Sequence, residues 1–116
     1  MKNKITVICL LISTLSYAQY TGETPWYTCY GKNASCEDYG CSAIEVKTSK
    51  TSPVVAIVKK YGKVIKHAYI PANNKYTFEI PDGTYQVFFY SGEHWNKYKS
   101  LNTNECDVVF GRFTSN

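Results

Sequence analysis

The sequence has few of the side chains from which catalytic and metal sites are built. It contains only two histidines, His67 and His94, and neither lies near a cysteine in a zinc-binding spacing. His67 alternates with Ile65 and Tyr69, which favours a structural role on a half-buried strand. The sequence offers no nucleophile with a histidine base and an orienting acid, no carboxylate pair for acid–base work and no glycine-rich phosphate loop. We therefore expect a protein that is not an enzyme and holds no cofactor or metal.

Strong charge and helical periodicity are also missing. The formal net charge is +4, and removing the two lysines at the start of the chain, Lys2 and Lys4, leaves +2. That charge is too small and too scattered to indicate nucleic-acid binding. Four lysines flank an expected turn, where a solvated face is the ordinary explanation: Lys59, Lys60, Lys63 and Lys66. Because no segment shows a helical period, the sequence predicts an all-β fold.

The one long apolar run lies at the start of the chain. Lys2 and Lys4 precede the apolar segment Ile5–Leu15, and small residues follow up to Ala18-Gln19. This layout predicts a secretory signal peptide over residues 1–18, cleaved near Ala18-Gln19. The run is shorter than the roughly 20 residues that span a bilayer, so we expect no transmembrane segment after cleavage. The mature protein would then be exported to the periplasm, the outer surface or the extracellular space.

Four cysteines remain after the predicted cleavage: Cys29, Cys36, Cys41 and Cys106. An even number in a small exported chain indicates two disulfides, for which three pairings are possible. We expect a local bridge, Cys29–Cys36, and a long-range bridge, Cys41–Cys106, between the first and last core strands. A bridge across so long a loop contributes roughly 3–5 kcal/mol in the chain-entropy model, and a domain this small depends on such help.

Short strand-forming runs begin near Cys41. We expect six strands, over Ser42–Thr48, Val54–Lys60, Val64–Ile70, Lys75–Ile80, Thr84–Tyr90 and Asp107–Phe113. Val54–Lys60 begins as a continuous apolar run, which is typical of a central strand, and Tyr61-Gly62 forms a tight turn after it. Residues 19–40 are predicted to be an irregular segment closed by a disulfide. Residues 41–116 are predicted to form a small antiparallel β-sandwich of about six to seven strands, with a partly open barrel as the alternative.

The stretch Lys75–Tyr90 carries the most information about architecture. Pro81-Asp82-Gly83 favours a turn between its two strands. A tight hairpin would put two apolar sets on opposite faces, with Tyr76, Phe78 and Ile80 on one and Tyr85, Val87 and Phe89 on the other. A corner, at which the chain crosses from one sheet to the next, lets both sets point into one core. We favour the corner.

A family resemblance rests on the same stretch. The pattern YTFEIPDGTYQVFFY resembles the strand, Pro-x-Gly-Thr-Tyr, strand signature of transthyretin-like and carboxypeptidase-regulatory-like β-sandwich domains. Residues 41–113 look more closely like a family of uncharacterised secreted proteins from Bacteroidota. The matching elements are Val54–Val58, His67–Ile70, Tyr76–Phe78, Gly83–Tyr90, Trp95 and Cys106. The resemblance implies a secreted sandwich with no established activity. Family members often continue with further strands, whereas this chain stops at Asn116, which implies an open sheet edge.

The expected polar loop Ser91–Asn104 groups aromatic side chains with lysines. His94, Trp95 and Tyr98 lie close together there, and such a loop can stack on a sugar ring or anchor a protein partner. The structural alternative, which we prefer, is that Trp95 folds back to cap one end of the sandwich.

Three functions remain open. We expect a secreted, non-enzymatic module that acts by surface binding, with an unknown protein or cell-envelope scaffold as partner and edge-strand association as one mode. The alternatives are a carbohydrate-binding domain, with a glycan at the cell surface bound through Trp95 and Tyr98, and a secreted hydrolase inhibitor.

Overall fold

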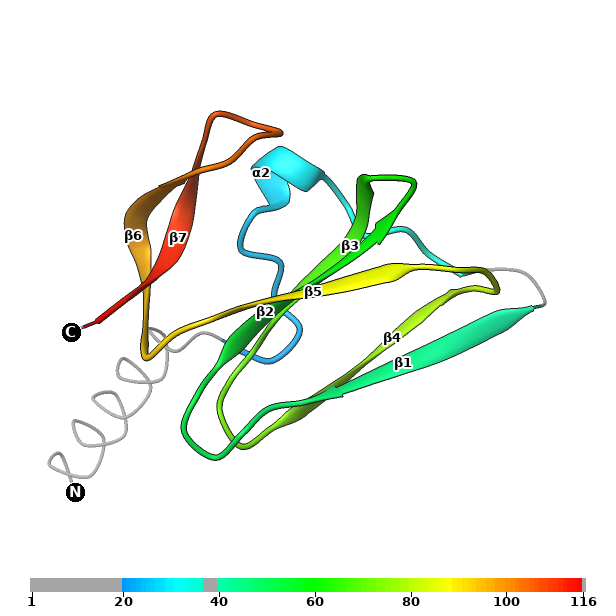
Figure 1. Cartoon of the computed structure of the whole chain (residues 1–116), viewed down its shortest axis with the longest axis horizontal. Helices are drawn as coiled ribbons and strands as arrows, with labels where there is room; N and C mark the ends of the chain where they lie inside the picture. Colours follow the sequence, from blue (N-terminus) through cyan, green and yellow to red (C-terminus); the bar gives the residue numbers. More distant parts are fainter. Residues whose placement is uncertain (1–19, 37–39, 116) are drawn as a thin grey trace, which may run out of the picture.

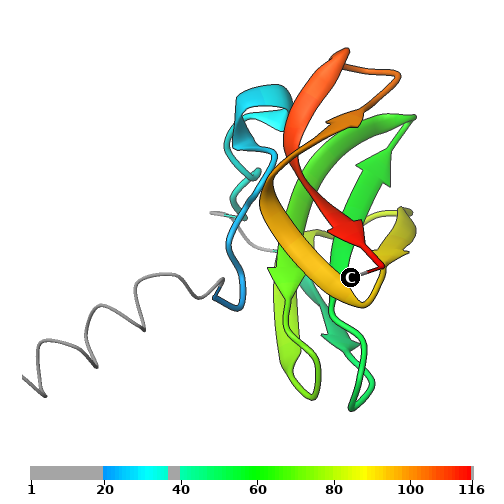
Figure 2. The same ribbon diagram turned by 90° about the vertical axis from the view of Figure 1, so that its left-hand side faces the viewer.

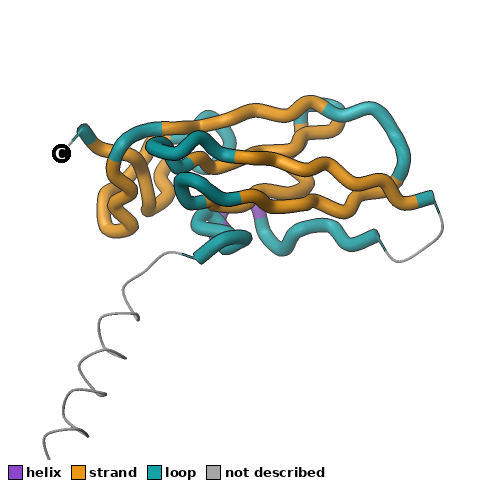
Figure 3. The backbone as a smooth tube through the Cα atoms, turned by 90° about the horizontal axis from the view of Figure 1, so that it is seen from below, coloured by secondary structure: helices purple, strands orange, loops and turns teal. Residues whose placement is uncertain are grey.

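Antiparallel strands make up most of the protein. The structure, a computed structural model, describes residues 20–36 and 40–115 (Figure 1). In chain order the elements are α2 (Tyr27–Tyr30), β1 (Cys41–Lys47), β2 (Val54–Lys60), β3 (Lys63–Ile70), β4 (Lys75–Pro81), β5 (Gln86–Ser91), β6 (His94–Asn102) and β7 (Val108–Thr114). The strands dominate the backbone trace, and the helix is a single short turn (Figure 3). The all-β prediction is therefore confirmed. The predicted signal peptide lies outside the described residues.

The seven strands of the described residues form three sheets, β1–β4, β3–β2–β5 and β6–β7, and every pair is antiparallel. β2 is central in the largest sheet, as its apolar run predicts. The β2–β3 hairpin turns at Tyr61 and Gly62, whose φ angles of 54° and 76° lie in the left-handed region. The β6–β7 hairpin crosses one face of the central sheet (Figure 2), and β1–β4 packs on the other face.

Two apolar cores lie on the two faces of the central sheet. The first core cluster consists of Val46, Ala56, Val58, Ala68, Ile70, Phe78 and Ile80. The second core cluster consists of Trp26, Val55, Tyr69, Val109 and Phe113. Consecutive residues of β2 therefore enter different clusters, which explains why its sequence is apolar without alternation. The expected sandwich has a third layer, made of the β6–β7 hairpin and the segment around Trp26.

The expected loop Ser91–Asn104 is mostly strand, and that part of the prediction is wrong. β6 pairs with β7 so that Trp95 lies opposite Phe113 and Leu101 opposite Val109. The register shifts between Asn96 and Ser100, so the apolar residues of β6 do not alternate with a period of two. Because of this bulge, β6 lacks the alternating apolar pattern by which a strand is predicted from sequence.

The corner at Pro81–Gly83 is confirmed. Within the described residues β4 pairs with β1 alone and β5 with β2 alone, so the chain changes sheets at this turn. The Tyr85 hydroxyl donates a hydrogen bond to the Pro81 carbonyl at 2.6 Å and holds the turn. The further expectation that both apolar sets enter one core is only partly right. Tyr85 packs against the first core cluster, but Phe89 is 59% exposed because β5 lies at a sheet edge.

Two disulfides are present, as predicted, but the expected pairing is wrong. The bridges are Cys29–Cys106 and Cys36–Cys41. α2 places Cys29 on the face of the central sheet where the β6–β7 turn carries Cys106, and their Cα atoms are 5.7 Å apart. Cys41 begins β1, which packs on the opposite face. The long-range bridge therefore fastens the N-terminal segment to the third layer. Across the described part of the chain, no helix is long and apolar enough to cross a membrane.

Candidate functional site: an open edge of the central sheet

The outer edge of β3 is covered by the segment that precedes β1. The Gly22 N–H donates to the Tyr69 carbonyl at 2.8 Å, and the Tyr69 N–H donates to the Glu23 carbonyl at 2.8 Å. Farther along β3, the Ala34 N–H donates to the Ile65 carbonyl at 3.0 Å. These bonds satisfy the N–H and C=O of Tyr69 and the C=O of Ile65, on an edge that would otherwise be free to pair with another strand.

Asn33 completes this cover with its side chain. Its Nδ2 donates to the His67 carbonyl at 3.1 Å, and its Oδ1 accepts from the His67 N–H at 3.0 Å. The amide thus provides the donor and acceptor that a residue of a neighbouring strand would offer. Nothing in the local sequence marks Asn33 for this role, because the contact spans 34 positions of the chain.

His67 ties the same segment to the core. The ring is fully buried, and its Nε2 accepts a hydrogen bond from the Trp26 N–H at 3.0 Å. It lies nearly parallel to the Trp26 ring, 6.0 Å between centroids, and meets Tyr30 edge-on. Burial lowers the pKa of His67 from 6.5 to about 4, so the imidazole is neutral at physiological pH. This environment agrees with the structural role expected from the sequence.

The outer edge of β5, by contrast, is open within the part of the chain that the structure describes. β5 pairs with β2 on one side, and no strand from the described residues pairs with its other side. β5 crosses in front of β2 and β3 in Figure 1. Its sequence, QVFFYS, has no charged residue and no proline, the features with which edge strands usually block pairing. Phe88 and Phe89 are 46% and 59% exposed. Within the described residues, the outward backbone groups of β5 therefore have no strand partner.

Opposite charges flank the two ends of β5. At its start, Lys59 pairs across the sheet with Gln86, and the Lys60 Nζ lies 5.4 Å from the centroid of the Tyr85 ring. Lys59 is neutralised by Glu105, 3.2 Å away, whereas Lys60 makes no ion pair with a described residue. At the other end, the exposed Glu93 follows β5 by two residues and likewise has no ion pair among the described residues.

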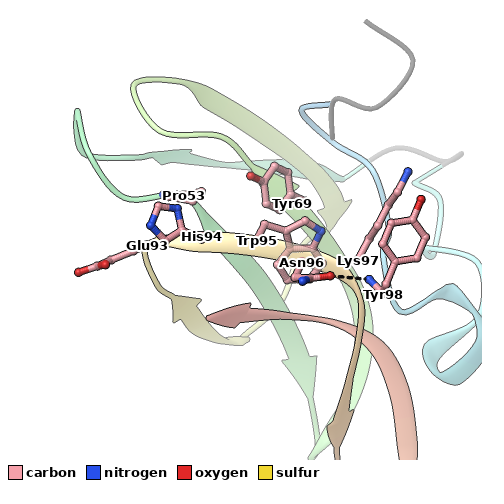
Figure 4. Close-up of a pocket in the computed structure, with 8 residues that line it drawn as sticks. All are labelled: Pro53, Tyr69, Glu93, His94, Trp95, Asn96, Lys97 and Tyr98. Carbon is pink, nitrogen blue, oxygen red and sulfur yellow. Dashed lines mark hydrogen bonds between the residues drawn. The ribbon is translucent and has the colours of Figure 1, made fainter. Parts of the chain in front are cut away.

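The three residues singled out in the sequence, His94, Trp95 and Tyr98, lie on β6. Trp95 turns inward, as the structural alternative predicts, with ring centroids 5.3 Å from Tyr69 and 5.0 Å from Phe113. His94 and Tyr98 are exposed, and Figure 4 shows them at opposite ends of the labelled group. A hollow of about 410 Å³ is lined by Pro53, Tyr69, Glu93, His94, Trp95, Asn96, Lys97 and Tyr98. Because Trp95 packs inward, these three side chains do not form a flat aromatic platform.

The described residues contain no group of three or more His, Cys, Asp or Glu side chains that could hold a metal ion. Comparison with protein-family models, curated proteins and solved structures finds no match to this chain. The geometry of the sheet edges is therefore the main basis for a functional proposal.

Proposed function

We propose that this protein is an exported, non-enzymatic β-sandwich module that binds a protein partner through the outer edge of β5. The observation that carries the proposal is the contrast between the two edges of the central sheet. The N-terminal segment covers β3 at Ile65, His67 and Tyr69, while β5 is unpaired on its outer side within the described residues. A sheet whose one edge is covered, while its opposite edge is open, uncharged and aromatic, is the arrangement expected of a protein that accepts a partner strand.

Binding would proceed by β-augmentation. A partner strand would make main-chain hydrogen bonds with β5, which supply affinity regardless of sequence. Its alternate side chains would meet Phe88 on the face of the second core cluster and Phe89 on the face of the first, because neighbouring residues point to opposite faces. The two exposed rings would therefore select apolar or aromatic residues at alternate positions of the partner.

Export is supported by the disulfides. Two bridges within so small a domain are typical of proteins that mature in an oxidising compartment. The apolar run at the start of the sequence points the same way.

A peptide-selection experiment tests the proposal and does not require the natural partner. The immobilised disulfide-bonded protein is used to select from a phage-displayed library of short linear peptides. We expect enrichment of peptides with apolar residues at alternate positions. The variant Phe89→Lys places a charge on the open edge and should abolish the enrichment.

Phe110→Lys is the matched control. Phe110 is 64% exposed on β7, which is not part of the central sheet, so this variant should select the same peptides as the wild type. A thermal melt of each variant shows that it is folded. The proposal is wrong if no alternating peptide is enriched, or if Phe89→Lys and Phe110→Lys retain the same peptides.

A further inference from the structure

We infer that the strand accepted by β5 is β5 of a second copy of this chain, paired antiparallel across a two-fold axis. The inference rests on the proposed function, because it names the partner of the same edge. It would join two central sheets into one continuous sheet of six strands, β3–β2–β5 from each copy.

The composition of β5 permits pairing with its own copy. In a two-fold antiparallel pair the same strand lies on both sides of the axis, so a charge near the middle of β5 would lie close to its own copy. The six residues of β5 carry no charge. The strand therefore meets the first requirement of self-pairing, which a single central lysine or glutamate would remove.

The exposed rings of β5 are placed so that a second copy covers them. A two-fold axis perpendicular to the sheet keeps each face on its own side, so opposite residues must come from the same face of β5. In the register centred on Phe88, Phe88 faces Phe88 of the second copy, and Phe89 faces Val87 of the second copy. The two exposed aromatic side chains of the edge, 46% and 59% accessible in one copy, are both covered. Aromatic cross-strand pairs of this kind stabilise sheets.

The charges at the two ends of β5 are complementary in an antiparallel pair. An antiparallel partner brings the start of one β5 beside the end of the other. In the same register, Gly83 faces Glu93 of the second copy, and a Cβ atom at Gly83 would lie 3.4 Å from the Lys60 Nζ. Lys60 makes no ion pair with a described residue, and the Glu93 carboxylate of the second copy, which likewise has no such partner among the described residues, arrives beside it. The two-fold axis makes this contact twice, so the edge is electrostatically complementary to itself.

Charge reversal tests the inference on the protein alone. Sedimentation equilibrium of the disulfide-bonded wild type should show a monomer–dimer equilibrium that weakens as salt is added. Lys60→Glu and Glu93→Lys should each raise the dimer dissociation constant roughly tenfold or more, because each creates two like-charge contacts. The double variant Lys60→Glu/Glu93→Lys restores opposite charges and should return to within a few-fold of the wild type. Lys50→Glu, an exposed charge reversal in the β1–β2 connection, should have no effect.

The outcomes separate this inference from the proposed function. A folded wild type that remains monomeric up to its solubility limit overturns the second copy as partner. If that monomer still enriches alternating peptides, the proposed function stands with a different occupant, and if it enriches none, both are wrong. A dimer that neither single charge reversal weakens, or that the double reversal does not restore, also overturns the inference.

Discussion

Acid should destabilise this protein through one buried side chain, His67. The unfolded chain takes up a proton on this histidine near pH 6.5, whereas burial lowers the pKa in the folded state to about 4. Between these two values the unfolded state binds more protons, so the free energy of unfolding decreases as the pH falls. The stabilisation that folding gains from a neutral His67 is fully present above pH 6.5 and is lost by about pH 4. The free energy of unfolding falls by about 3 kcal/mol over this whole range, and about 2 kcal/mol of that loss has occurred by pH 5.

The variant His67→Gln isolates this effect. Glutamine offers an oxygen that can accept the Trp26 N–H bond, which His67 Nε2 now accepts, but it does not titrate. We expect the variant to be less stable than the wild type at pH 7, by about 1–3 kcal/mol for altered packing and hydrogen bonding. Between pH 7 and pH 5, however, the variant should lose about 2 kcal/mol less than the wild type.

Urea unfolding followed by tryptophan fluorescence at pH 7, 6 and 5 measures both quantities. The control is His94→Gln, which removes the other histidine, an exposed one, and should keep the pH dependence of the wild type. Equal losses of stability by His67→Gln and the wild type between pH 7 and pH 5 would show that His67 is not the source of the acid sensitivity. The same conclusion would follow if His94→Gln, rather than His67→Gln, removed the pH dependence.

Three further perturbations test the contacts that hold the layers together, each by urea unfolding at pH 7. Asn33→Ala leaves the outward N–H and C=O of β3 without their side-chain partner and should cost about 1–3 kcal/mol; an unchanged stability would show that the amide does not seal this edge. Replacing both Cys29 and Cys106 by serine should cost about 2–5 kcal/mol, and a smaller loss would mean that the third layer is held without the bridge. Gly111 has a φ of 112°, and a Cβ at this position would lie only 2.6 Å from the Trp95 ring. Gly111→Ala should therefore lower the free energy of unfolding by about 1–3 kcal/mol, and an unchanged stability would contradict the close packing of Trp95.

The central architecture follows from local patterns. Alternating apolar residues predict β1 and β4, and the uninterrupted apolar run predicts that β2 is central. The mismatch of faces around Pro81–Gly83 predicts the corner, because no tight hairpin can bury both apolar sets on one side. These inferences succeed because the period of a strand is a property of a few consecutive residues.

The remaining features depend on contacts between distant segments. β6 breaks its period at the bulge between Asn96 and Ser100, and only the pairing with β7 reveals it as a strand. The disulfide pairing depends on which face of the central sheet each segment covers, which cysteine spacing does not specify. The seal that Asn33 makes on β3 is likewise invisible locally, since asparagine is common in loops. For the same reason, the difference between the sealed and open edges emerges only from the fold.

Hydrogen exchange of the β3 and β5 amides, measured by NMR in dilute protein and again at high concentration, tests the central claim most directly. The account predicts slow exchange at His67 and Tyr69 in both samples, because the N-terminal segment binds these amides. It predicts that the β5 amides not bonded to β2 exchange rapidly in dilute protein and become protected as the second copy binds. Slow exchange along the whole of β5 in dilute protein would show that this edge is already occupied, and would contradict the account.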